Sequence, residues 1–243
     1  MQSFSELMEF ENQIRTHFGS KFGVMKDSMS RSQVPPYSTD YYFIPPNPLS
    51  GHNFWIILTS GMSNQPMSTS LQEYQYCEFM MFLDSDQWNL NLNCAMGGHP
   101  MIPSYPPAKN DFRGDESLRW PLISLKKIMM YPHMNRTWVG HYHTLDMEGQ
   151  HCGNYHGFLL KKSQIFPAEA ELFHVNGKHI NLYVAIPVFQ NEMNIAQKSG
   201  CEELISLFDK HNVNEITQLH REPVKNNSST KRSDVSNREK YFI

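Results

Sequence analysis

The chain has 243 residues, of which 40% are hydrophobic and 12% aromatic, so it is long enough to bury a substantial core. Charged residues make up 19% and the formal net charge is −3, which argues against a nucleic-acid-binding protein. No segment approaches the roughly 20 apolar residues of a membrane-spanning helix. The four cysteines form no CxxC pair, so we expect reduced thiols and a cytoplasmic protein that binds neither nucleic acid nor membrane.

The first half of the chain is expected to contain one helix followed by three strands. Apolar side chains recur at helical spacing in residues 3–18, so one face of this helix should pack on a sheet. The segments "DYYFIPP" (40–46) and "NFWIILTSG" (53–61) are rich in aromatic and β-branched residues and are separated by turn formers, which predicts two strands. The segment "EYQYCEFMMFL" (73–83) is apolar on both faces, which predicts a central, buried strand.

The second half is expected to combine helices with shorter strands. Leu122, Leu125, Ile128 and Met129 would share one face of a helix, and the pair Asn-Gly at 176–177 suits a tight hairpin turn. The expected elements are a helix at 116–132, short strands near 137–143 and 156–161, a β-hairpin at 171–189, and helices at about 188–198 and 201–211 that Gly200 separates.

Strands mixed with helices, without regular βαβ alternation, predict a single α/β domain of the α+β type. Its central sheet should be mixed, largely antiparallel and flanked by helices. We expect an N-terminal helix and lead-in at residues 1–39, the domain at 40–215, and a polar, basic, disordered tail at 216–243.

Residues 84–117 form the longest stretch without periodicity, and they contain several Pro and Gly. A loop of this length in a compact domain is usually functional or disordered. We expect it to be an insertion that covers a groove, with aromatic side chains as anchors for a protein partner. The expected anchors are Trp88, Tyr105 and Phe112.

The segment "TSGMSNQPM" (59–67) is open to three interpretations. A phosphate loop needs several glycines and a Gly-Lys-Ser/Thr ending, but this segment has one glycine and no lysine. A nucleophile elbow needs Gly-x-Ser-x-Gly, and the second glycine is missing here. The third interpretation is a turn at the end of a strand, in which Thr59, Ser60 and Ser63 bond to backbone groups.

Histidines and one acidic residue are further candidates for chemistry. His141 and His143 would face the same side of a strand, as two zinc ligands could, but the spacing matches no standard zinc site, and structural histidines are favoured. Glu78 lies in the apolar run "YCEFMMFL", so its carboxyl must be hydrogen-bonded, paired or protonated. It could serve as a general acid or base, although a structural anchor is the favoured interpretation.

Taken together, the motifs resemble the Suppressor of fused domain family in order and spacing. "TSGMSNQPM" resembles the signature Thr-Ser-Gly-Met-Ser-x-x-Pro-Met of that family, and the segments after residue 120 resemble its central and closing blocks. The closing block includes Pro187, Glu192-Met193 and Gly200. The residues that carry the rest of the resemblance are Thr59, Ser60, Gly61, Met62, Ser63, Pro66, Met67, Glu78, Trp120, Pro121, Pro132, His133, Thr137, Trp138, His143 and Thr144.

The resemblance implies a mixed sheet flanked by helices and a protein-binding role, with no catalytic residues, metal or cofactor. The animal protein binds a transcription-factor peptide by strand addition between two domains, and this chain is too short to hold the second domain. Bacterial single-domain members resemble immunity proteins, which neutralise a toxin by occluding it. Two alternatives stay open, a peptide-binding regulator and a hydrolase built from Glu78, His133, His143 and Ser60 or Ser63, with or without zinc.

Overall fold

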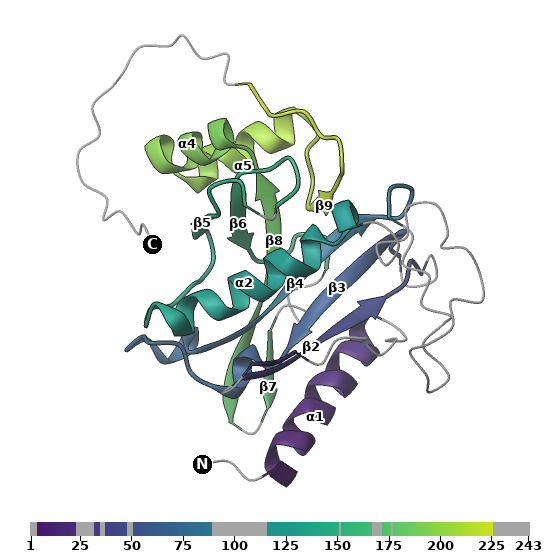
Figure 1. Ribbon diagram of the computed structural model, residues 1–243, viewed down its shortest axis with the longest axis vertical. Coiled ribbons are helices and arrows are strands. Elements are labelled where there is room, and N and C mark those ends of the chain that lie inside the picture. Colours follow the sequence, from purple (N-terminus) through teal and green to yellow (C-terminus); the bar gives the residue numbers. More distant parts are fainter. Residues whose placement is uncertain are drawn as a thin grey trace.

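A computed structural model of the chain contains a nine-stranded sheet in which the strand order along the main path is β1-β2-β3-β4-β8-β6-β5 (Figure 1). The residues that it describes are 4–22, 32–34, 37–47, 51–88, 116–150, 152–166, 172–175 and 177–225. The strands are β1 (Ser32–Val34), β2 (Tyr37–Ile44), β3 (Phe54–Ser60), β4 (Tyr76–Asp84), β5 (Thr144–Asp146), β6 (Gly157–Lys161), β7 (Leu172–Val175), β8 (Lys178–Val188) and β9 (Ile216–Thr217).

Helices cover both faces of this sheet, so the domain has three layers (Figure 1). One face carries α1 (Phe4–Phe22), α4 (Gln190–Ser199) and α5 (Cys201–Lys210), and the other carries α2 (Trp120–Met134). The layers explain why β4 is apolar on both sides, since Met80 and Phe82 belong to one core and Phe79 and Met81 to the other.

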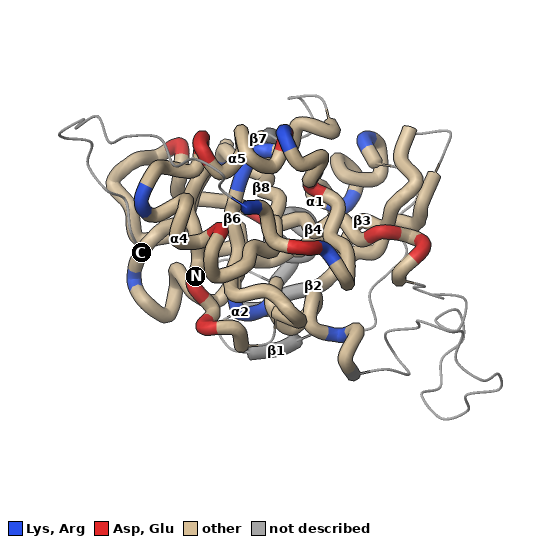
Figure 2. The backbone as a smooth tube through the Cα atoms, turned by 90° about the horizontal axis from the view of Figure 1, so that it is seen from above, with Lys and Arg blue, Asp and Glu red and all other residues tan. Residues whose placement is uncertain are grey.

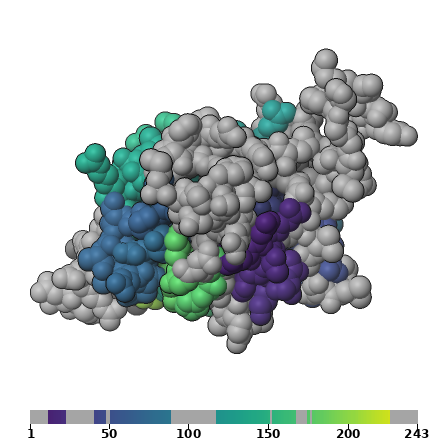
Figure 3. Space-filling view, turned by 90° about the horizontal axis from the view of Figure 1, so that it is seen from below, coloured from purple at the N-terminus to yellow at the C-terminus, as the bar shows by residue number. Residues whose placement is uncertain are grey.

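The sheet is mixed and largely antiparallel, which confirms the fold class expected from the sequence. The pairing of β4 with β8 is parallel, whereas β4 with β3 and β8 with β6 are antiparallel. The expected hairpin is confirmed as β7 and β8, whose registered pairs include His174 with His179. Figure 3 shows this hairpin (green) at the surface beside α1 (purple).

Most of the expected helices and strands are present, but the strand expected at 137–143 is wrong. Those residues form a loop and a turn, and the strand β5 begins only at Thr144. The physical reason is the backbone of Tyr142, whose φ of 66° lies in the left-handed region and interrupts an extended chain.

The expectation of a disordered tail from residue 216 is also wrong for its first part. Residues 216–225 lie along the domain, and Thr217 and Val224 are buried. Strand β9 pairs in parallel with the end of β4, at Phe82 and Leu83, beyond the point where β8 stops pairing with β4. The segment therefore fills the space that opens where β4 and β8 diverge, and residues 226–243 lie outside the described part of the chain.

Charged residues of both signs are interspersed over the described part of the chain, and neither sign collects on one side in the view of Figure 2. No described helix is long and apolar enough to cross a bilayer.

Candidate functional site

The carboxylate of Glu78 is the centre of the "TSGMS" motif. Glu78 is fully buried, and its Oε1 accepts hydrogen bonds from the backbone N–H groups of Gly61 and Ser63, each at 2.9 Å, and from the Ser63 hydroxyl at 2.6 Å. The Thr59 hydroxyl donates to Oε2 at 2.7 Å and itself accepts from the backbone N–H of Phe79 at 2.8 Å. The motif is therefore a turn folded around an acidic side chain. The third interpretation expected a turn, but the Thr59 and Ser63 hydroxyls donate to the Glu78 carboxylate and not to backbone groups.

The backbone of Gly61 makes this turn possible. Its φ of 118° is accessible to glycine but strained for other residues, and it directs the N–H groups of residues 61 and 63 to the same oxygen. A short 3-10 helix, Met62–Asn64, follows at once. Lys178 of the β7–β8 hairpin lies beside this short helix, with its Nζ 3.4 Å from the carbonyl oxygen of Asn64.

Burial raises the pKa of the Glu78 carboxyl, while the hydrogen bonds from Ser63, Thr59 and Gly61 oppose that shift. A group sealed from solvent in this way has no route to a substrate. Glu78, Ser60, Ser63 and His143 are buried, and neither they nor His133 line the open cavities of about 280 and 180 Å³. The five side chains of the hydrolase alternative therefore do not converge on these cavities.

The histidines of the motif blocks have different surroundings. The imidazole of His143 is buried and contacts Trp138, with ring centroids 4.6 Å apart, and burial lowers its pKa. His141 is exposed and its Nδ1 accepts the backbone N–H of Lys162 at 3.0 Å, so the two do not form the expected same-face pair. Among the described residues, no group of three or more His, Cys, Asp or Glu side chains could hold a metal ion.

His133 connects helix α2 to the motif turn. Burial lowers its pKa, and a hydrogen bond to the backbone of Met62 opposes that shift. The Pro132 carbonyl at the end of the helix accepts the N–H of Thr137 at 2.8 Å, and the Thr137 carbonyl accepts the N–H of Ser68 at 3.1 Å. The segments 59–68 and 132–138 are therefore joined by the His133 side chain and by the backbone hydrogen bond between Ser68 and Thr137. Met67 is buried and Pro66 is exposed.

The aromatic residues of the central block belong to the core between the sheet and α2. Trp120 packs against Tyr155 and Phe158, at ring-centroid distances of 5.8 and 6.5 Å, and Pro121 lies in the first turn of α2. The expectation that Trp88 anchors a partner is wrong, because this side chain is fully buried. Its ring centroid lies 6.2 Å from that of Trp120. The other expected anchors, Tyr105 and Phe112, lie outside the described residues.

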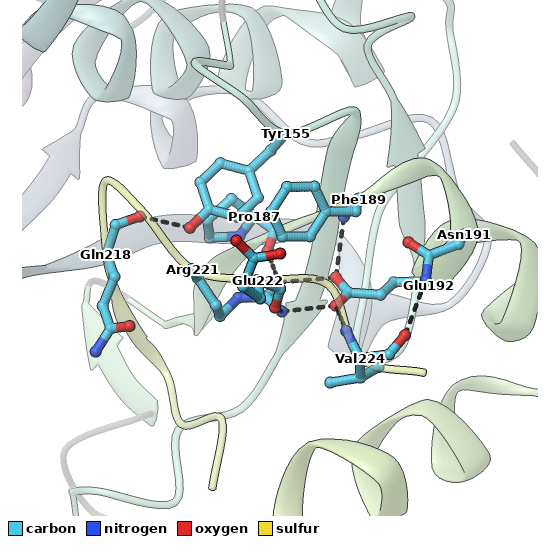
Figure 4. Close-up of polar contacts among 9 residues, drawn as sticks. All are labelled: Tyr155, Pro187, Phe189, Asn191, Glu192, Gln218, Arg221, Glu222 and Val224. Carbon is cyan, nitrogen blue, oxygen red and sulfur yellow. Dashed lines mark hydrogen bonds and ion pairs between the residues drawn. The ribbon is translucent and has the colours of Figure 1, made fainter. Parts of the chain in front are cut away.

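A second buried carboxylate, Glu192, lies at the start of α4 and pairs with Arg221 (Figure 4). Its Oε1 accepts a hydrogen bond from Nη1 of Arg221 at 2.6 Å, and its Oε2 accepts one from Nη2 at 2.7 Å. The sequence motif contained Glu192, but Arg221 was missed because it lies in a polar segment that resembles a disordered tail. Apolar residues within that segment, Ile216, Leu219 and Val224, are the signal that could have revealed it.

Comparisons with known proteins agree with this architecture. The family model described as Suppressor of fused protein (SUFU) matches residues 35–222. No curated protein sequence matches the chain. A crystal structure described as a SUFU homologue from Neisseria gonorrhoeae FA 1090 has a TM-score of 0.57 and 12% identity, over 91% of this chain and all of the other.

Two further solved structures share the fold. The Sufu–Fu complex has a TM-score of 0.52 at 12% identity, over 82% of this chain and 84% of that chain. Drosophila Suppressor of Fused has a TM-score of 0.50 at 12% identity, and the match takes in 81% of this chain but only 46% of the Drosophila chain. With the family model matched over most of the domain and its motif wrapped around Glu78, the chain belongs to the Suppressor of fused family.

Proposed function

We propose that this chain is a non-enzymatic protein-binding domain, an immunity or inhibitor protein that neutralises a toxin or effector by occluding it. The observation that carries the proposal is the free outer edge of β5. This strand ends the main path of the sheet, and no other described strand pairs with its outer side. An extended segment of a partner could add to it as a further strand.

The hydrogen bonds around β5 identify the backbone groups that face outward. The carbonyl of His143 accepts a hydrogen bond from the N–H of Leu160 at 2.8 Å, and the N–H of Met147 donates to the carbonyl of His156 at 3.2 Å. The backbone groups of residues 143 and 147 therefore face β6. Because backbone groups alternate along an antiparallel strand, Leu145 also faces β6. The N–H and C=O groups of Thr144 and Asp146 therefore point away from the sheet.

Family membership and charge support a protein as the partner. One relative of known structure is in the Sufu–Fu complex, and in SUFU this type of domain is a protein-interaction domain. Asp146 and Glu148, at the end of β5, are exposed acidic side chains on a chain with a net charge of −3. Such charges accelerate encounter with a basic partner.

A peptide-binding regulator is the second candidate, and the same strand edge favours it. It would use the same backbone groups and differ only in the partner. Co-expression distinguishes the two candidates: a partner that arrests cell growth alone, and is harmless with this chain, supports the immunity role. A partner that is harmless alone supports a regulator.

Removing the outward-facing backbone N–H of Thr144 in β5 tests the binding surface. We expect Thr144→Pro to abolish capture of the partner, because proline cannot donate to an added strand and edge strands tolerate it. The matched control Thr144→Val keeps the N–H and should capture the partner as the wild type does. The measurement is affinity capture followed by mass spectrometry, with melting temperatures of both variants. A folded Thr144→Pro variant that retains the same stoichiometric partner would disprove this surface.

A further inference from the structure

The guanidinium of Arg221 is enclosed more completely than an ordinary surface ion pair. Glu192 is fully buried and holds it through two parallel hydrogen bonds, the geometry that discriminates arginine from lysine. The rings of Phe189, Phe208 and Tyr155 surround it, with their centroids 4.9, 5.2 and 5.5 Å from Cζ. The Pro187 carbonyl accepts from Nη2 at 3.2 Å.

The same site also holds the backbone three residues after the arginine (Figure 4). The N–H of Val224 donates to Glu192 Oε1 at 2.9 Å, and the Val224 carbonyl accepts from Asn191 Nδ2 at 2.8 Å. The Val224 side chain is itself buried. The site therefore holds an arginine side chain together with the backbone and the apolar side chain of the residue three positions later.

The groups that form the site belong to the domain rather than to the segment that fills it. They come from the end of β8, from α4 and α5, and from the loop before β6. Glu192 is held in place independently by the N–H of Phe189, which donates to Oε2 at 2.9 Å. A carboxylate fixed in this way keeps its position whichever arginine it meets.

The occupying segment, residues 214–225, is held before Arg221 by strand β9, which pairs with β4, and by Glu215, which pairs with buried Lys161 at 3.0 Å. The carbonyl of Gln218 accepts from the Tyr155 hydroxyl, and the N–H of Leu219 donates to the Gln87 side chain. A cavity of about 280 Å³ lies within the loop of residues 211–224, and another of about 180 Å³ lies between Lys161, Phe208 and Glu215. The segment therefore borders open space on one side. Such a peripheral segment opens at lower free energy than a core does.

We infer that this groove is a receptor for an extended partner segment that carries arginine followed three residues later by an apolar residue. Residues 221–224 fill the receptor within the same chain, and a partner segment of the same pattern displaces them. This site uses other residues than the outer edge of β5, so the inference rests on observations different from those behind the proposed function.

Emptying the receptor in the full-length chain tests this directly. In Arg221→Ala/Val224→Asp, the carboxylate at position 224 repels Glu192 and expels the segment. The probe is a fluorescent peptide of residues 217–226, measured by anisotropy. We expect it to bind this variant at least about tenfold more tightly than the wild type, where the attached segment competes at millimolar effective concentration.

The peptide with Ala in place of its arginine is the matched control and should bind neither protein. Equal binding of both peptides, or no gain over the wild type, would overturn the inference.

A second experiment covers the case in which that variant does not fold. A protease site placed between Asn212 and Asn214 allows the folded wild-type sequence to be cut after purification. We expect the labelled peptide to exchange into the cut protein, and the Ala peptide to fail to do so. A cut segment that stays bound without exchange would show a purely structural lock. Concentration-dependent dimers of the uncut chain would assign the groove to a second copy instead, and either result would overturn the inference.

Discussion

Glu78 shows how a single residue organises the family motif. A carboxylate in a strand that is buried on both faces must be supplied with donors, and four donors from residues 59–63 converge on it. The requirement for partners was predictable, because Glu78 interrupts an apolar run in the sequence. The identity of the donors was also accessible, since Thr59 and Ser63 flank a glycine in a turn-forming segment.

Glu78→Gln should lower the free energy of unfolding by about 1–3 kcal/mol, because an amide presents N–H groups to donors that need an acceptor. The control is Glu73→Gln, an exposed side chain, which should change stability by less than about 0.5 kcal/mol. Urea unfolding of both variants checks the difference. Equal effects from the two substitutions would contradict the role given to Glu78.

His143 should contribute a pH dependence of stability. Burial lowers its pKa in the folded state, so the unfolded state binds the proton more readily below the ordinary value of about 6.5. The corresponding stability is present above that pH and is lost as the pH falls. We expect the melting temperature to drop between pH 7.5 and 5.5 by less in His143→Gln than in the wild type.

The control for that comparison is His220→Gln at an exposed position, which should keep the wild-type drop. The difference between variant and wild type also cancels the opposing contribution of Glu78. Its raised pKa favours the folded state as the pH falls toward the ordinary carboxyl value.

At the scale of elements, long periodic segments were predicted well and special backbone positions were not. The buried strand β4, the β7–β8 hairpin and the helix pair separated by Gly200 follow the apolar pattern of the sequence. The left-handed conformation of Tyr142 leaves no such signal, and it displaced the expected strand. The short strand β9 was missed because its pairing depends on the divergence of β4 and β8, a feature of the whole sheet.

The turn after β3 can be tested with two Gly→Ala substitutions that should change the free energy of unfolding in opposite directions. Gly61→Ala should destabilise the protein by about 1–2 kcal/mol, because its φ of 118° is strained for alanine. Gly19→Ala lies in α1 with no atom near the added Cβ and should stabilise it by about 0.5–1 kcal/mol. Thermal or urea unfolding checks the pair. A neutral Gly61→Ala would show that the turn does not require glycine.

On the scale of the whole molecule, the fold and the surfaces differ in how far the sequence determines them. The motif residues reach the family fold although the solved relatives share only 12% identity with the chain. Surfaces depend on which segments end up side by side. Trp88 was expected as an exposed anchor and is buried, whereas Arg221 was expected in a disordered tail and occupies a closed site.

The central claim is that a protein partner adds to the outer edge of β5. The most direct measurement is amide hydrogen exchange of the full chain, with and without the captured partner. We expect the amides of Thr144 and Asp146 to gain protection in the complex, while those of Gly61 and Ser63, already bonded to Glu78, stay unchanged. Protection confined to other parts of the chain, with residues 144–146 exchanging as in the free protein, would contradict the claim.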